Sequence, residues 1–241
     1  MRDPRSIVAA RFRARTAQAA RGASLVFGGL AYRTVLLAVL AAWPLAAGVA
    51  VEDLAFCQLG QDAQDAGKYE QAVASYSKCI EVGDLSPFNL AAVYFNRANA
   101  YSDLSDFQRA ISDYDEAIHL DPDGADIYLN RGLAYANAHD YSRAVVDFDQ
   151  AIDLDRDFGL AYQNRCLAMS LLGRLDEALR DCNESLRLQP GSVWALDRRA
   201  LTYWLLGQQD KARRDLEEAR AIDPSRPGWQ ERFRQFEKFS P

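Results

Sequence analysis

The chain has 241 residues, enough to bury a sizeable core, and it carries a formal net charge of −6. Residues 1–50 contain seven arginines, no lysine and one acidic residue, Asp3, which leaves 21 of the 28 basic and 33 of the 34 acidic residues for the rest of the chain. Phosphate contacts need clustered Lys and Arg, so a body with a net charge of −12 argues against nucleic acid as its partner.

The N-terminal region divides into a basic leader, residues 1–33, which we expect to be disordered, and an uncharged apolar segment at 34–51. A basic region, an apolar core and small residues at the exit describe a secretory signal peptide, which predicts an exported protein, periplasmic or extracellular. An uncleaved membrane anchor is a second interpretation, although Pro44 and many alanines make a poor span. An organellar transit peptide is a third, because the segment is rich in arginine and poor in acidic residues.

Asparagine recurs every 34 residues along the body of the chain, and the residues around it recur with it. The repeated phrases are Tyr94-Phe95-Asn96-Arg97-Ala98, Tyr128-Leu129-Asn130-Arg131-Gly132 and Tyr162-Gln163-Asn164-Arg165-Cys166, and Arg198 takes the next asparagine slot. A period of this length indicates one supersecondary unit copied in tandem. Such arrays build binding surfaces more often than reaction centres.

The second half of each copy carries a small residue, an aromatic or its substitute four positions later, and a small residue three positions after that. These spacings place all three on one face of a helix, where small side chains let a second helix approach closely. Pro122, Pro190 and Pro224 end this second helix. The triplets are Ala110, Tyr114 and Ala117; Ala144, Phe148 and Ala151; Ala178, Cys182 and Ser185; and Ala212, Leu216 and Ala219.

Both the period and the small/aromatic pattern resemble the tetratricopeptide repeat family. The resemblance implies an all-α fold, a right-handed α-solenoid of about five helix-turn-helix hairpins, although Arg156 and Met169 depart from the usual proline and tyrosine. Residues 227–241 form a predicted capping helix and tail, with Trp229, Phe233, Phe236 and Phe239 on one stripe. The five copies span 53–90, 91–124, 125–158, 159–192 and 193–226, and the first is degenerate with a longer loop.

The resemblance also implies a concave groove in which the recurrent asparagine bonds the backbone of a bound peptide, since a primary amide both donates and accepts. We assign this role to Asn96, Asn130 and Asn164; the alternative is an asparagine that faces solvent or bonds a neighbouring helix. Three bonds of about 0.5–1.5 kcal/mol fall short of the roughly 8 kcal/mol of a micromolar complex, so apolar contacts must supply the rest. The other groove positions are Arg198, Phe95, Leu129, Leu133, Leu167, Leu171, Trp194, Leu201 and Trp204.

Arginine follows the asparagine slot in four copies, and aspartate recurs sixteen residues after each arginine. The degenerate first copy has neither, with Leu59 and Ser75 in their place. Because the two charges appear and vanish together, they predict an ion pair between the two helices of each hairpin. We therefore interpret the arginines as structural rather than ligand-binding. The pairs are Arg97 with Asp113, Arg131 with Asp147, Arg165 with Asp181 and Arg199 with Asp215.

Four cysteines make an even number in a chain with an export signal, which is typical of disulfides. Cys166 and Cys182 fall on facing helices of one hairpin, and Cys57 and Cys79 fall on opposite helices of another. We hypothesise one disulfide within each hairpin. The alternative is buried thiols that replace small or aromatic residues.

Enzymatic motifs are absent from the sequence: His119 and His139, the only histidines, lack metal-ligand spacing, and there is no phosphate loop or nucleophile elbow. No cofactor or metal is expected. The sequence predicts a non-catalytic adaptor or scaffold that binds a protein or peptide ligand in the groove. The alternative is a structural, self-associating spacer in a cell-envelope assembly. Either protein would meet a membrane only through an uncleaved N-terminal segment.

Overall fold

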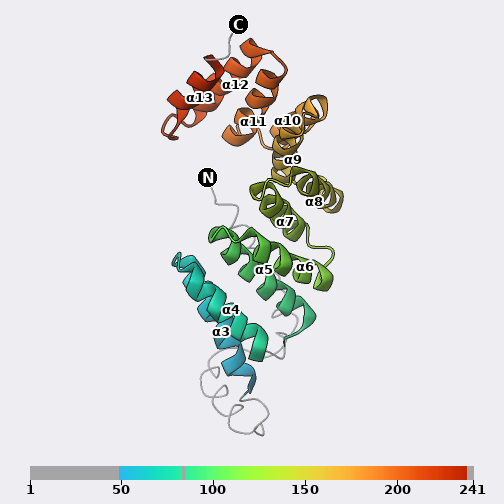
Figure 1. Ribbon diagram of the computed structural model, residues 1–241, viewed down its shortest axis with the longest axis vertical. Helices are drawn as coiled ribbons and strands as arrows, with labels where there is room; N and C mark the ends of the chain where they lie inside the picture. The colour runs from blue at the N-terminus through green and yellow to red at the C-terminus, as the bar shows by residue number, and fades with distance from the viewer. Residues whose placement is uncertain (1–48, 83–84, 238–241) are drawn as a thin grey trace, which may run out of the picture. The chain divides into compact units, whose positions relative to one another are not determined.

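The computed structural model describes residues 49–82 and 85–237, and within these ranges it contains eleven helices and no strand. The predicted all-α fold is confirmed, and the helices follow one another as hairpins along the chain (Figure 1). Their bounds are α3 Val49–Asp65, α4 Tyr69–Val82, α5 Pro87–Asp103, α6 Phe107–Leu120, α7 Ala125–Asn137, α8 Tyr141–Leu154, α9 Gly159–Leu171, α10 Leu175–Leu188, α11 Val193–Leu205, α12 Gln209–Ile222 and α13 Trp229–Glu237.

The hairpins stack in chain order. Each second helix packs against its own first helix and against the first helix of the next hairpin. First helices also touch one another, α5 with α7, α7 with α9 and α9 with α11, whereas no contact of that extent joins two successive second helices. The side that the first helices share is therefore the more closely packed side of the array. This is the arrangement of an α-solenoid, as the period predicted.

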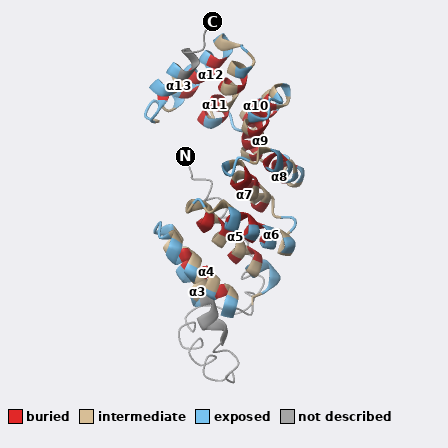
Figure 2. Cartoon of the chain, in the orientation of Figure 1, coloured by how far each residue is buried: buried red, intermediate tan, exposed pale blue. Residues whose placement is uncertain are grey.

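The small/aromatic pattern is explained by the seam of each hairpin. A Cβ atom added to Gly132 would lie 2.6 Å from Cε1 of Phe148, and one added to Gly60 would lie 2.6 Å from the ring of Tyr76. Both aromatic rings are almost fully buried. Buried residues run along the seams from hairpin to hairpin (Figure 2). The small residue is thus required by the ring that lies against it.

One position in the turn of each hairpin has a left-handed backbone. It is glycine at Gly67, Gly173 and Gly207, but Ser105 and His139 occupy it with φ of 61° and 64°. This residue follows the first helix and lets the chain reverse within a few residues. Glycine adopts such a φ without strain, so the serine and histidine hairpins carry a small conformational cost.

Helix ends follow the residues that the sequence marks. α6, α10 and α12 each end two residues before a proline, as predicted. α8 has Arg156 at the corresponding position and still ends at Leu154, where the side chain of Asp155 accepts a hydrogen bond from the backbone N–H of Asp157. The same side-chain turn follows α12, where Asp223 accepts from the backbone N–H of Ser225 beside Pro224, so the turn ends a helix with or without proline.

The C-terminal helix α13 covers the last hairpin. Trp229 is buried against Val193, Leu196 and Leu216, and its Nε1 donates to the backbone carbonyl of Asp223 at 2.9 Å. The helix begins at Trp229, inside the predicted capping segment. The side chains of Phe236 and Phe239, assigned to the same stripe, lie outside the described residues.

Most of the N-terminal region also lies outside the described residues: the predicted leader, and the signal or anchor segment up to residue 48. α3 begins at Val49, ahead of the predicted start of the first copy at residue 53. Among the helices of residues 49–82 and 85–237, none is both long and apolar enough to span a membrane. The repeat array from Asp53 onward is one compact unit.

Candidate interaction surface

The three asparagines lie at one register position on successive first helices, α5, α7 and α9. Nδ2 of Asn130 donates to the backbone carbonyl of Asp126 at 2.7 Å, and Nδ2 of Asn164 donates to that of Leu160 at 2.8 Å. Asn96 bonds none of the described residues through its side chain. The two bonds run within the asparagine's own helix, so they fix the orientation of the amide. Each amide keeps its carbonyl oxygen and a second N–H. Asn96 and Asn130 lie at half-buried positions, whereas Asn164 is 9% exposed and offers a ligand little surface.

The apolar positions assigned to the groove differ in exposure. Leu171 and Trp194 are among the exposed large apolar side chains of the described residues, at 47% and 55% exposed. Half-buried positions form a second set, and Trp204 in it packs partly against the cluster around Leu216. The members of this half-buried set are Leu133, Leu167, Leu201 and Trp204.

Two assigned positions, Phe95 and Leu129, are corrected by the structure, because they are buried and offer a ligand little surface. The ring of Phe95 packs against Tyr114 of the same hairpin, with their centroids 6.0 Å apart. A 34-residue period shows that these positions are equivalent between copies. It does not show how far round the helix the exposed face extends.

The predicted ion pairs are confirmed in all four hairpins. Each arginine donates two hydrogen bonds to its aspartate, from Nε and Nη2, with donor–acceptor distances of 2.6–2.9 Å. Its remaining Nη1 donates to a side chain on the second helix of the preceding hairpin, which the sequence reading missed. These second acceptors are Ser77 for Arg97, Asp115 for Arg131, Asp149 for Arg165 and Asn183 for Arg199.

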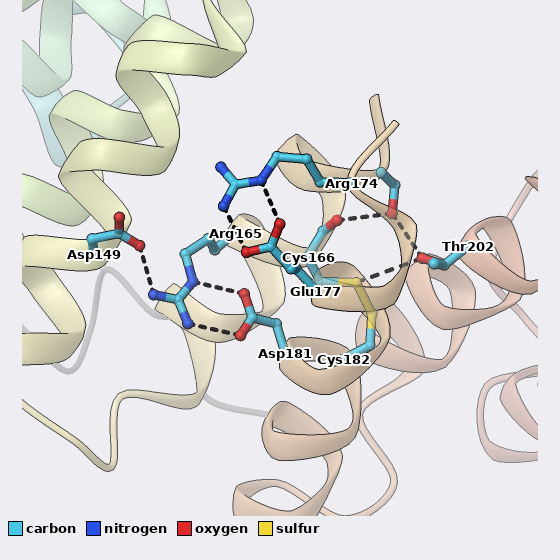
Figure 3. A network of polar contacts seen from close by, with 9 residues as sticks. Asp149, Arg165, Cys166, Arg174, Glu177, Asp181, Cys182 and Thr202 are labelled. Carbon is cyan, nitrogen blue, oxygen red and sulfur yellow. Dashed lines mark hydrogen bonds and ion pairs between the residues drawn. A yellow bond between two sulfur atoms is a disulfide. The ribbon is translucent and has the colours of Figure 1, made fainter. Parts of the chain in front are cut away.

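Arg165 shows the arrangement at close range (Figure 3). It lies on α9 between Asp181 of α10 and Asp149 of α8, with donor–acceptor distances of 2.6–2.7 Å. Burial lowers the pKa of the guanidinium, but the hydrogen bonds to Asp181 and Asp149 outweigh burial and raise that pKa above its ordinary value. With three donor atoms engaged, the arginine row joins helices and is not available to a ligand.

Arg198, which takes the asparagine slot in the fifth copy, differs from these arginines because its guanidinium lacks hydrogen-bond partners. Its Nη1 is shielded from solvent and has no hydrogen-bond partner, and the guanidinium bonds no other described residue. Burial lowers the pKa of Arg198 to about 10. The carboxylate of the adjacent Asp197 is taken by Arg232, at 2.8 and 2.9 Å, and by Arg226 at 3.5 Å. The period could not predict these partners, because Arg226 is the last residue of the fifth copy and Arg232 lies beyond it in α13.

Both hypothesised cysteine pairs are joined in the structure. Cys57 of α3 is bonded to Cys79 of α4, and Cys166 of α9 to Cys182 of α10, with Cα–Cα distances of 5.2 and 5.5 Å. Cys166 and Cys182 occupy the positions that Gly132 and Phe148 fill one hairpin earlier. The disulfide replaces the small/aromatic contact across the seam.

Helical hairpins that repeat every 34 residues and stack through their first and second helices define a repeat-built interaction fold. Family models described as TPR repeat and tetratricopeptide repeat match residues 98–138, 125–158, 55–82 and 195–226. The chain belongs to the tetratricopeptide repeat family. No curated protein matches its sequence.

Solved structures share the fold at low sequence identity. YrrB, described as a TPR protein with an unusual peptide-binding site, is 20% identical with a TM-score of 0.60, over 74% of this chain and 90% of that one. MamA from Desulfovibrio magneticus is 15% identical with a TM-score of 0.65, over 73% and 97%. A thermophilic TPR protein from Thermus thermophilus is 16% identical with a TM-score of 0.61, over 78% and 100%.

Proposed function

We propose that this protein is a non-catalytic adaptor that binds a peptide segment of a partner along the first-helix surface, defined as the side shared by α5, α7, α9 and α11. The observation that carries the proposal is the row Asn96, Asn130 and Asn164 on successive first helices. The amides of Asn96 and Asn130 are half-buried with hydrogen-bonding capacity left over, and the buried Asn164 continues the row. YrrB, whose fold is similar, is described as having a peptide-binding site.

The asparagine row suits a peptide backbone. A peptide unit presents one N–H and one carbonyl, and a primary amide offers the complementary acceptor and donor whatever the ligand's side chains are. The bonds from Asn130 and Asn164 to their own helices hold two of the amides in place before a ligand arrives. Such pre-organisation lowers the entropy lost on binding.

Leu171 and Trp194 supply the apolar part of the proposed surface. Burying exposed apolar area stabilises a complex by about 25 cal/mol per Å², and tryptophan is often an energetic centre of an interface. Both residues lie on the same first helices as the later copies of the asparagine slot. A ligand with backbone contacts at the middle copies and apolar side chains at the later ones fits this arrangement.

The experiment is affinity selection from a soluble mixture of random synthetic peptides, with bound peptides identified by mass spectrometry. Replacing all three asparagines by alanine should weaken a selected peptide by about two- to tenfold per lost hydrogen bond, without lowering the thermal unfolding midpoint. Asn137→Ala, an exposed asparagine at the end of α7, is the matched control and should leave affinity unchanged. Equal affinities for the triple variant and the wild type would defeat the assignment of the row.

A self-associating spacer is the second candidate, because the exposed Leu171 and Trp194 could equally bury themselves against another copy. Sedimentation over a wide concentration range separates the two proposals. A strict monomer at high concentration excludes the spacer, and a dimer that Leu171→Glu dissociates excludes a free adaptor surface.

We also propose that the protein works outside the cytoplasm, exported or held at a membrane by its N-terminal segment. Two disulfides in one small array favour an oxidising compartment, where such bonds persist. Mass spectrometry of the native protein under non-reducing conditions tests this. Four free thiols would remove the support, and the observed N-terminal residue would decide between a cleaved and a retained leader.

A further inference from the structure

The first helix of the array, α3, is less firmly built into the fold than the other first helices. Gly60 is the only buried residue among its described residues 55–65, whereas α5, α7, α9 and α11 each bury five to eight residues. Leu59, in the position of the structural arginine, is 53% exposed, and Ser75 stands in the position of the aspartate. The first hairpin therefore lacks the ion pair that joins the helices of the other four.

The noncovalent contacts described between α3 and α4 centre on one buried ring. Gly60 lies against the ring of Tyr76, and the hydroxyl of Tyr76 donates to Oε1 of Gln64 at 3.0 Å. Phe56 is half-buried, and Nζ of Lys78 lies 5.5 Å from the centroid of its ring. Because α3 buries so little, we expect it to open locally at a lower free energy than the rest of the array.

The Cys57–Cys79 disulfide is the covalent link between α3 and α4, and it is more accessible than the second disulfide. Cys79, Cys166 and Cys182 are 0% exposed, whereas Cys57 is half-buried. Thiol–disulfide exchange requires a thiolate to approach one of the two sulfurs. Cys57 is therefore the cysteine that a thiol from solution can approach.

We propose that the Cys57–Cys79 bond is a site of thiol–disulfide exchange, and that its reduction by a dithiol, such as a reduced disulfide oxidoreductase, releases α3 from α4. A thiolate of the dithiol attacks Sγ of Cys57, the bond to Sγ of Cys79 breaks, and Cys79 leaves as a thiolate that takes up a proton. The second thiol of the reductant then attacks the mixed disulfide and frees Cys57. The reductant ends as a disulfide and the protein as two thiols, so two electrons and two protons pass to the protein.

Release of α3 changes the surface that the array presents. Tyr76 is 1% exposed, and part of its cover is the backbone of α3 at Gly60. Without α3 this part of the ring meets solvent, and four complete hairpins remain. The Cys166–Cys182 bond has no such effect, because its hairpin keeps an ion pair and a well-buried first helix when the bond is reduced. Oxidation of the two thiols of the first hairpin restores the link.

The first experiment asks which bond is reduced in the folded, full-length protein. The protein is treated with limiting dithiothreitol, the reaction is quenched with acid, and free thiols are mapped by mass spectrometry after alkylation of the unfolded chain. Thiols should appear at Cys57 and Cys79 at least about tenfold faster than at Cys166 and Cys182, because attack on a disulfide depends on access to its sulfurs.

Hydrogen exchange then reports whether α3 is released. Exchange at residues 55–65 should quicken on reduction by about a hundredfold, the factor that the chain-entropy account gives for a cross-link between residues 22 positions apart. Residues 159–171 of α9 are the internal control in the same sample, and their exchange should not change.

Leu59→Arg combined with Ser75→Asp is the matched variant, because it places the ion pair of the other hairpins in the first one. Its α3 should stay protected after the same reduction. A variant with Cys57→Ala and Cys79→Ala should exchange rapidly at α3 with and without reductant. Preferential reduction of Cys166–Cys182, or an α3 that stays protected in the reduced wild type, overturns the proposal.

Discussion

One guanidinium, that of Arg165, joins three helices: Nε and Nη2 bond Asp181 across its own hairpin, and Nη1 bonds Asp149 of the preceding hairpin at 2.6 Å. The arrangement recurs at Arg97, Arg131 and Arg199 with different second acceptors. The same side chain therefore fixes the pairing of helices within a hairpin and the stacking between hairpins. Asn96, Asn130 and Asn164 each precede one of these arginines, so their positions depend on both the helix pairing and the stacking.

Removing the carboxylate of Asp181 should destabilise the protein far more than removing that of Asp149. The Asp181 side chain is 9% exposed, so Asp181→Ala leaves a partly buried guanidinium uncompensated and should cost about 3 kcal/mol of unfolding free energy. The Asp149 side chain is 50% exposed, so Asp149→Ala should cost less than about 1 kcal/mol. Urea unfolding of both variants measures the difference, and equal costs would contradict this division of roles.

Asp140 should make part of the stability depend on acidic pH. Its side chain caps α8, and the hydrogen bonds from the backbone and then the side chain of Arg143 hold its pKa below the ordinary 3.8. A carboxylate with a depressed folded-state pKa stabilises the fold above its unfolded pKa, and this contribution is lost as pH falls through the folded value. The affected window is therefore below about pH 3.8.

Asp140→Asn isolates that contribution. Asparagine caps a helix about as well as aspartate, so stability at neutral pH should change little beyond the loss of the exposed ion pair with Arg143. The acid limb of the stability curve should become shallower than in the wild type. Thermal unfolding between pH 2 and pH 6 measures both, and superimposable acid limbs would rule out this role for Asp140.

The Cys166–Cys182 bond should account for a measurable share of stability. The two residues are 16 positions apart, and closing a loop of this length stabilises by about 3 kcal/mol in the chain-entropy account. Unfolding with and without reductant, in a variant in which alanine replaces Cys57 and Cys79 and with reduction verified by mass, gives the value for this bond alone. An unchanged midpoint after full reduction would show that the seam packs equally well without the bond.

The neighbouring hairpins suggest a matched variant for the same position. In the hairpin of α5 and α6 the equivalent residues are Ala98 and Tyr114, which pack without a disulfide. Cys166→Ala combined with Cys182→Tyr should therefore stay folded, and its remaining response to reductant should be that of Cys57–Cys79 alone. Failure of this double variant to fold would show that the fourth hairpin has adapted its surroundings to the smaller bridge.

Arg198→Met should raise the stability of the unliganded protein, in contrast to a loss at the structural arginines. The substitution removes a shielded, unpartnered donor, whose burial costs about 1–3 kcal/mol, and keeps most of the side-chain volume. Arg165→Met in parallel should lower stability because it leaves Asp181 unpaired. A large loss for Arg198→Met would mean that the guanidinium has a structural partner in solution.

The fold was predictable because its determinants repeat. The approach of a small residue to an aromatic ring recurs at Gly60 with Tyr76 and at Gly132 with Phe148, and the joint loss of arginine and aspartate in the first copy predicted the pairing. The second acceptors, such as Asp115 and Asp149, keep a fixed spacing from the arginines and could have been found by the same comparison. The network of Asp197 and Arg232 could not, because α13 has no counterpart in the other copies.

The candidate surface was predicted less completely. Phe95 and Leu129 were assigned to the groove, yet they are buried, and so are Gln163 and Asp197 at the same register in the next two copies. Exposure depends on how neighbouring helices meet, which is set by side-chain volumes in three elements at once rather than by the period. Likewise, Arg198 lacks a partner because Arg226 and Arg232 bind the carboxylate of its neighbour Asp197.

The most direct test of peptide binding on the first-helix surface is photo-crosslinking of a selected peptide from two sites. A benzophenone side chain replaces Leu171 on α9 in one protein and Val146 on α8 in the other; the native residues are 47% and 64% exposed. We expect the peptide to be captured at position 171, to be displaced there by unlabelled peptide, and not to be captured at 146. Capture at 146 with none at 171 would place the binding site on the second helices and contradict the account.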